Sequence, residues 1–152
     1  MFESSALLGG ELWRLVTAHF THLSTSHLAW NTATFLVLLL WSSKLGKLDE
    51  SLEFVAVAAP ALSVLLLLAG IDWYLGLSGV LHGLLVLLLL QSTAVIKWPG
   101  IALLVVKLWL QPRFDGVSTV QQSLPVLHEA HWLGVALALG YCLLRRPGLQ
   151  LS

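Results

Sequence analysis

The sequence predicts an all-α membrane protein whose helices cross the bilayer several times. Of its 152 residues, 57% are hydrophobic and 11% are charged, and the mean hydropathy is +0.85. So few charged residues could not cover a water-soluble domain of this length. The apolar runs are also too long for barrel strands, which alternate apolar and polar residues over about ten positions. We therefore expect a single helical transmembrane domain over residues 1–152.

Five apolar runs are the expected spans, because crossing the hydrocarbon takes about 20 residues and at least about 17. They are residues 28–41, 54–69, 73–96, 101–110 and 126–144, most of which need their polar flanks to reach that length. The expected connections are residues 42–53, 70–72, 97–100 and 111–125. Pro, Gly, Asp and Ser in the later connections indicate turns and irregular structure.

The basic residues predict the orientation of these spans. Threading the five spans back and forth places Lys44, Lys47, Lys97, Arg145 and Arg146 on one side and Arg14 and Arg113 on the other. Basic residues are enriched in cytoplasmic loops, so we expect the C-terminus in the cytoplasm and Met1 outside. A polar N-terminal segment on the outer side also leads us to expect a further span upstream of Met1.

Charge and cysteine content exclude other classes. Eight basic residues balance eight acidic ones and form no basic cluster, so nucleic acid is not an expected partner. Cys142 is the only cysteine, which excludes an intrachain disulfide or a CxxC metal site.

Polar residues that are costly at membrane depth, and therefore suggest function, gather near the outer ends of three expected spans. They are His22, His27 and Asn31 in the first span, Ser78 and His82 in the third, and His128, Glu129 and His131 in the fifth. We expect three helices to bring these side chains to one level.

Ser78 lies in Gly76-Leu77-Ser78-Gly79, ahead of an apolar run in which Gly83 follows Gly79 by four. This GxxxG spacing would by itself only let helices approach closely. A serine at a helix N-terminus could instead be a nucleophile, because the free N–H groups there stabilise an oxyanion.

Such a serine needs a base, and two histidines could serve. His82 lies one helical turn after Ser78 and could equally be a structural neighbour. His131 is followed by Gly134, a small surface on which the third and fifth spans can touch. We favour His131.

His27 and Asn31 share one helix face and could donate to an oxyanion, or could simply cap and tie the first span. Glu11 and Arg14 are spaced for a local ion pair. His128-Glu129-Ala130-His131 is one residue short of the zinc motif HExxH, which weakens a metal site. Haem held by His27 or His82 together with His131 remains an alternative.

Jointly these residues resemble the rhomboid family of intramembrane serine proteases. The matching pieces are Glu11-Leu12-Trp13-Arg14-Leu15, His22, the HxxxN of His27 to Asn31, the GLSG around Ser78 and the Ala-His-x-x-Gly of Ala130 to Gly134. They follow the family order across nearly the whole chain. The closer similarity is to the rhombosortase branch, because His82 stands where most rhomboids carry Tyr.

The resemblance implies a rhomboid-like polytopic helix bundle with a Ser–His dyad and no cofactor. Ser78 would be the nucleophile and His131 the base. The Ser78 backbone N–H, His27 and Asn31 would form the oxyanion hole. The remaining implied site residues, which would orient or support these, are His82, His22, Gly79 and Gly134.

The rhombosortase resemblance also implies a place and a substrate. The protein would be a multi-pass enzyme of the bacterial inner membrane, with its active site toward the periplasm. It would cleave single-span proteins at a C-terminal Gly-Gly tail. We expect three departures from the family pattern: the first of six core spans would be missing, Ala138 replaces a Gly, and Glu129 stands where many rhombosortases have Asp. Besides a haem- or metal-binding subunit, a catalytically inactive rhomboid-like binding protein is the other alternative.

Overall fold

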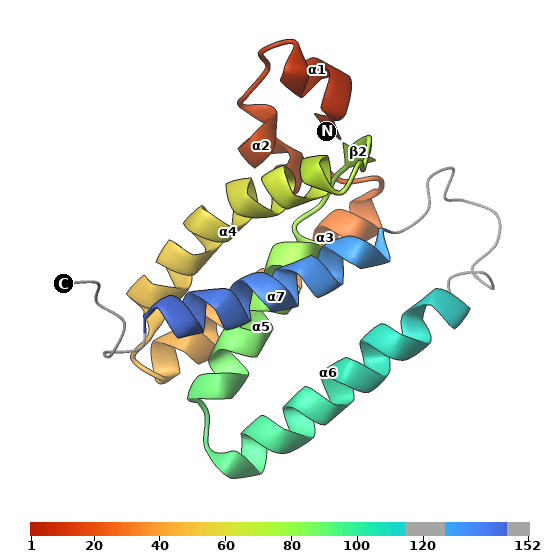
Figure 1. Cartoon of the computed structure of the whole chain (residues 1–152). Helices are drawn as coiled ribbons and strands as arrows, with labels where there is room; N and C mark the ends of the chain where they lie inside the picture. The colour runs from red at the N-terminus through yellow and green to blue at the C-terminus, as the bar shows by residue number, and fades with distance from the viewer. Residues whose placement is uncertain (115–126, 146–152) are drawn as a thin grey trace.

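The computed structural model describes residues 1–114 and 127–145, with side chains up to Gln111 in the first range. In this part of the chain, five longer helices form a bundle (Figure 1). They are α3 (Thr25–Lys44), α4 (Leu48–Leu68), α5 (Ser78–Gln91), α6 (Ala94–Phe114) and α7 (His128–Leu144). Short elements precede them or lie between them: β1 (Phe2–Glu3), α1 (Ser4–Leu8), α2 (Arg14–Thr17), η1 (Ala18–Phe20) and β2 (Trp73–Tyr74).

Helix α5 lies at the centre of the bundle and packs against α3, α4, α6 and α7. Apart from Ser78, His82 and Gln91 its residues are apolar or glycine, which is typical of a helix buried all round. Its first residue is Ser78, so this position is held by the most enclosed helix of the bundle.

Glycines allow α5 and α7 to pack closely. A Cβ atom at Gly83 would lie 2.5 Å from the Gly134 carbonyl oxygen, and one at Gly79 would lie 2.8 Å from that of Ala130. A Cβ at Gly134 would overlap the Gly79 carbonyl group. The small-residue stripe in the sequence is therefore a real packing surface, and Ser78 lies at its end.

The N-terminal segment braces the loop that leads into α5. Strand β1 pairs antiparallel with β2, with Phe2 opposite Tyr74, and Phe2 is fully buried. The Gly76 N–H donates to the Ala18 carbonyl of η1 over 3.1 Å. The expected Glu11–Arg14 ion pair is present at 2.7 Å, and Arg14 also donates to the Met1 carbonyl. The approach to Ser78 is thus fixed from outside the bundle.

The helix lengths bear on the expected number of spans. In the described residues, α4 and the Ala94–Gln111 part of α6 are long and apolar enough to cross a membrane. A third crossing results if Arg14–Phe20 and Thr25–Lys44, which are bent by 99°, form one broken span. The five expected spans correspond in order to α3 to α7, but α5 has only 14 residues. Five crossings and a missing first span stay predictions.

The predicted turn at residues 97–100 is wrong, because these residues lie inside α6. The chain turns earlier, at Ser92, whose backbone is extended (φ −86°, ψ 167°). Gly100 serves packing, since a Cβ there would overlap the side chain of Leu89. The third span is consequently shorter than residues 73–96, because Trp73–Tyr74 form β2 and the helix begins only at Ser78.

The predicted connection over residues 42–53 is also too long. Helix α3 continues to Lys44 and α4 begins at Leu48, so the turn occupies residues 45–47. Gly46, at φ 66°, adopts the left-handed conformation of this turn. Asp49 and Glu50 lie in the first turn of α4, where carboxylates stabilise the helix N-terminus. Of the connection expected at 111–125, residues 111–114 are helical and the rest lies outside the described residues.

Candidate active site

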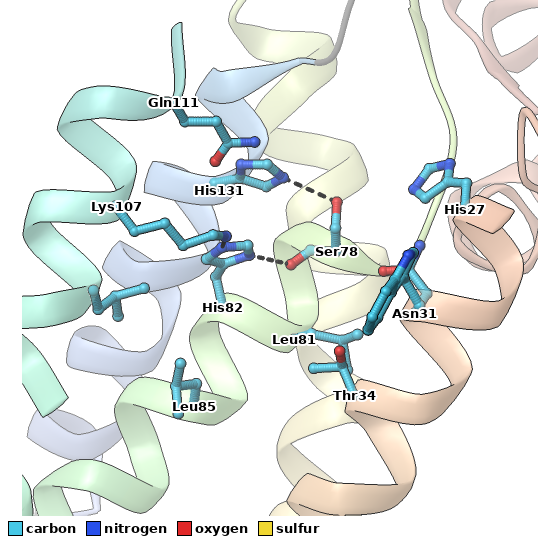
Figure 2. Close-up of a pocket in the computed structure, with 12 residues that line it drawn as sticks. His27, Asn31, Thr34, Ser78, Leu81, His82, Leu85, Lys107, Gln111 and His131 are labelled. Atoms are coloured by element: carbon cyan, nitrogen blue, oxygen red, sulfur yellow. Dashed lines mark hydrogen bonds between the residues drawn. The ribbon is translucent and has the colours of Figure 1, made fainter. Parts of the chain in front are cut away.

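The side chains of Ser78 and His131 are hydrogen-bonded across the α5–α7 interface. The distance from Ser78 Oγ to His131 Nε2 is 3.0 Å (Figure 2). Ser78 is the first residue of α5 and His131 lies in the first turn of α7. The close contact of Gly134 with Gly79 brings the two helices near enough for this bond. The structure therefore joins the two residues expected to be nucleophile and base.

The N-terminus of α5 offers backbone donors beside Ser78. Its N-cap residue, Leu77, has no polar side chain and makes no cap hydrogen bond. The Gly79 N–H has only a long bond, 3.4 Å, to the Tyr74 hydroxyl. The first N–H groups of a helix have no carbonyl partner within the helix, so they can bind a negatively charged oxygen.

His27 and Asn31 line the same cavity as Ser78. Ser24 caps α3 by accepting from the His27 backbone N–H over 3.1 Å, so the His27 ring is not the cap. Asn31 is 6% exposed, and its Nδ2 has no hydrogen-bond partner among the described residues. Gly76, at φ 103°, passes so close that a Cβ there would lie 2.9 Å from His27 Cε1. Both side chains are thus available to a bound group.

His82 does not contact the Ser78 hydroxyl. Its Nδ1 lies 2.7 Å from the Ser78 backbone carbonyl oxygen, which can only accept, so Nδ1 carries the hydrogen. The ring of His82 stacks on that of His131, with centroids 4.2 Å apart and planes 23° apart. This geometry suits a neighbour that orients His131, and it does not suit a base acting on Ser78.

Two cavities meet at Ser78. The larger, of about 390 Å³, extends toward α6, and the other, of about 240 Å³, extends toward β2 and Leu127. Their shared lining residues are His27, Trp30, Ser78 and His131. An extended chain lying over Ser78 would have space on both sides of the serine.

The remaining expected site residues lie around this centre. The His22 ring contacts the His27 ring edge-on, with centroids 5.0 Å apart, so His22 packs against His27. His128 and His131 are farther apart, at 6.3 Å. Glu129 is exposed in the first turn of α7, where its charge suits the helix N-terminus. Ala138, at 0% exposed, fits in place of the family glycine.

The metal and haem alternatives gain no support from this arrangement. Within residues 1–114 and 127–145, no three His, Cys, Asp or Glu side chains are grouped to hold a metal ion. Two histidines that hold a haem must lie on opposite faces of the macrocycle. The rings of His82 and His131 stack directly on each other instead.

Sequence analysis missed three residues of the site. The Nζ atom of Lys107, on α6, lies 2.6 Å from His82 Nε2. It is the one charged residue in the run 101–110, a signal that was sufficient to single it out. Gln111, one turn later, also lines the larger cavity. Tyr74 gave no such signal; burial raises the pKa of its phenol to about 12, so the phenol stays neutral where it meets α5.

The fold and the site together define a helical membrane protein with a serine–histidine pair in a cavity between its helices. Residues 9–147 match the model of the Rhomboid domain. The chain therefore belongs to the rhomboid family, which is a family of intramembrane serine proteases. No curated protein and no solved structure matches the chain.

Proposed function

We propose that this protein is an intramembrane serine endopeptidase in which Ser78 is the nucleophile and His131 its base. The observation that carries the proposal is the 3.0 Å contact between Ser78 Oγ and His131 Nε2 at the junction of two cavities. A hydroxyl is a weak nucleophile unless a base within hydrogen-bond reach takes its proton. Here Nε2 is within that reach.

The proposed reaction is transfer of the substrate acyl group to Ser78, followed by hydrolysis of the resulting ester. As Ser78 Oγ bonds to the scissile carbonyl carbon, its proton passes to His131 Nε2. The carbon–nitrogen bond then breaks, and the same proton passes from Nε2 to the leaving amine. A water molecule then attacks the resulting ester while His131 Nε2 takes one of its protons. His131 passes this proton to Ser78 Oγ as the acid product leaves.

The negative charge on the carbonyl oxygen develops beside three donors. These are the Ser78 backbone N–H at the start of α5, the His27 ring and the Asn31 amide. Asn31 carries the strongest support, because its amide is buried, faces the cavity and has no partner among the described residues. One donor of this kind is typically worth about 2.7–4 kcal/mol of transition-state stabilisation.

The proposed orientation places this site toward the periplasm of a bacterial inner membrane. His27, Ser78 and His131 all lie near the N-terminal ends of their helices, so those three ends meet at the site. Lys44, Lys47 and Arg145 lie at the opposite helix ends, as basic residues on the cytoplasmic side would. In a Cys142→Ala background, Ser4→Cys should be labelled from outside intact cells and Ser152→Cys should not.

The proposed substrate is the C-terminal tail of an exported protein, with a Gly-Gly pair, an apolar helix and a basic end. The backbone must be extended to reach Ser78, and each glycine disfavours a helix by about 1 kcal/mol relative to alanine. Cleavage is therefore expected at or near the glycine pair. This choice rests on the similarity to rhombosortases.

Labelling with a fluorophosphonate tests the chemistry without a known substrate. We expect the purified protein to be modified at Ser78, and both Ser78→Ala and His131→Ala to remain unmodified. Ser26→Ala is the matched control, because Ser26 lines the smaller cavity but bonds only to Ser24 in the described contacts. An unlabelled wild type would indicate an inactive member of the family.

The substrate is tested by reconstitution with a Gly-Gly tail protein and its Leu-Leu version. The Gly-Gly protein should be cut and the Leu-Leu version largely spared. Equal cleavage of both proteins, or cleavage in the basic end, would refute the sorting-tail assignment. The protein would then be a rhomboid protease without specificity for Gly-Gly tails.

A further inference from the structure

Lys107 is a charged residue on an apolar helix, and it reaches the site through His82. It belongs to α6, which lies at the edge of the bundle (Figure 1). Its Nζ lies 2.6 Å from His82 Nε2, and it lines the larger cavity together with Ser78 (Figure 2). A lysine at membrane depth is costly, which favours a functional explanation for it.

The two contacts of His82 define its protonation. Nδ1 donates its hydrogen to the Ser78 carbonyl oxygen. The second contact joins His82 Nε2 to Lys107 Nζ. Because lysine is a far stronger base than imidazole, the proton between these two nitrogens stays on Lys107. His82 Nε2 must then accept from the Lys107 ammonium. His82 is thereby held neutral, with both nitrogens bonded and its ring plane fixed.

His131 depends on this fixed ring. Its Nδ1 is buried and has no hydrogen-bond partner among the described residues, so none of their carboxylates holds the imidazole through this nitrogen. Among the described residues, its closest contacts at the site are the bond to Ser78 and the stack on His82. Losing the orientation of His82 would therefore let the His131 ring rotate.

We propose that Lys107 is a positioning residue for the Ser78–His131 pair, acting by holding His82 neutral and in the plane on which His131 stacks. This proposal rests on the proposed function of that pair. Lys107 itself touches neither reacting atom. It also joins α6 to the catalytic helices, since its hydrogen bond runs from α6 to α5.

The charge of Lys107 has a second consequence. Among the described residues, four titratable groups face His131: His82 from α5, Lys107 from α6, His27 from α3 and His128 on its own helix. Among these, Lys107 brings the permanent positive charge, which opposes a second positive charge on His131. Removing it makes His131 easier to protonate in the resting enzyme. The acidic limb of the activity profile should then move to higher pH.

Lys107→Met keeps the length of the side chain and removes both the donor and the charge. We expect the rate constant for fluorophosphonate labelling of Ser78 at its pH plateau to fall, by as much as about 100-fold. The acidic limb should move to higher pH. Lys107→Arg retains donor and charge and should restore both features. Lys97→Met, near the other end of α6, is the matched control and should resemble the wild type.

A second measurement is independent of activity. In protein labelled with ¹⁵N-histidine, His82 should show a protonated Nδ1 and a hydrogen-bonded Nε2, with its resonances identified by their loss in His82→Gln. Lys107→Met should shift the Nε2 resonance to that of an unbonded nitrogen, and Lys97→Met should not.

The outcomes separate this proposal from the proposed function. An unreactive wild type would overturn the proposed function. An active wild type with an unchanged rate, pH profile and Nε2 resonance in Lys107→Met would overturn the role of Lys107 alone. A fallen rate that Lys107→Arg does not restore would also overturn it, because position 107 would then be merely structural.

Discussion

The part of the molecule that the structure describes contains two serine–histidine pairs with the same distance between Oγ and Nε2. In one, Ser78 Oγ lies 3.0 Å from His131 Nε2. In the other, Ser63 Oγ lies 3.0 Å from His19 Nε2. The first pair joins α5 to α7 and lines two cavities, whereas the second joins α4 to η1 and is fully buried.

The hydroxyl hydrogens of the two serines point to different partners. Ser63 Oγ donates to the Leu15 carbonyl oxygen over 2.8 Å, so its oxygen can only accept from His19. His19 is therefore the donor in that pair and cannot take the serine proton. Ser78 is able to donate to His131. An equal distance thus describes a structural tie in one region and the proposed nucleophile with its proposed base in the other.

The comparison teaches that access and the direction of the hydrogen bond distinguish a reactive serine from a structural one. Both side chains of the Ser63 pair are 0% exposed. A substrate could not reach Ser63 without opening the contact between η1 and α4. The same pair fixes the segment that braces the approach to Ser78, because Ala18, next to His19, accepts from Gly76.

The largest expected effect is the loss of the accessible pair. Ser78→Ala or His131→Ala should lower the rate of peptide cleavage by at least about 10⁴-fold, since the serine and its base act as one unit. The two variants should unfold at nearly the wild-type temperature. If Ser78→Ala retains cleavage, Ser78 is not the nucleophile, and Ser63 would then have to be reconsidered for that role.

Asn31→Ala should have the next largest effect. Removing an oxyanion donor costs about 10²- to 10³-fold in kcat, with KM little changed. Steady-state kinetics on a cleavable substrate would measure it, and His27→Ala should behave in the same direction. If KM rises while kcat is unchanged, these residues bind the substrate uniformly and do not stabilise the oxyanion.

Ser63→Ala tests the buried pair and should affect stability instead of chemistry. It leaves the Leu15 carbonyl and His19 without their hydrogen-bond partner, which costs about 1–3 kcal/mol of unfolding free energy. Denaturation in a fixed detergent would measure the loss. Fluorophosphonate should still label Ser78 in the folded variant, and a loss of labelling without a loss of stability would contradict the structural role.

Tyr74 lies between the two regions, and its removal should have the smallest effect. Its ring contacts His19 at 5.4 Å, and its hydroxyl accepts from the Gly79 N–H. Tyr74→Phe should cost about 0.5–1.5 kcal/mol of stability at neutral pH. Because burial raises the pKa of this phenol from 10.0 to about 12, its neutral form is favoured by folding. The wild type should therefore lose stability between about pH 10 and 12 relative to Tyr74→Phe, and parallel stability curves would exclude this linkage.

The sequence by itself determined the class of the protein and singled out His27, Asn31, Ser78, His82 and His131, which meet at the site. Long apolar runs require helices, because backbone groups in lipid must be bonded within each segment. The short motifs around His27, Ser78 and His131 each occur within one helix or its start, so local spacing reveals them. Their order also carried the resemblance to the rhomboid family, which the match over residues 9–147 confirms.

Only the tertiary structure decided which small residues pack, where the helices begin, and which serine is accessible. Pro99 and Gly100 predict a turn locally, yet both lie inside α6, where a Cβ at Gly100 would overlap the side chain of Leu89. Ser63 and His19 are 44 positions apart and carry no motif. Their pairing depends on the folding of the N-terminal segment over α4. Lys107 likewise gains its partner from α5, 25 positions away. Such contacts depend on how whole helices pack, and local spacing does not encode them.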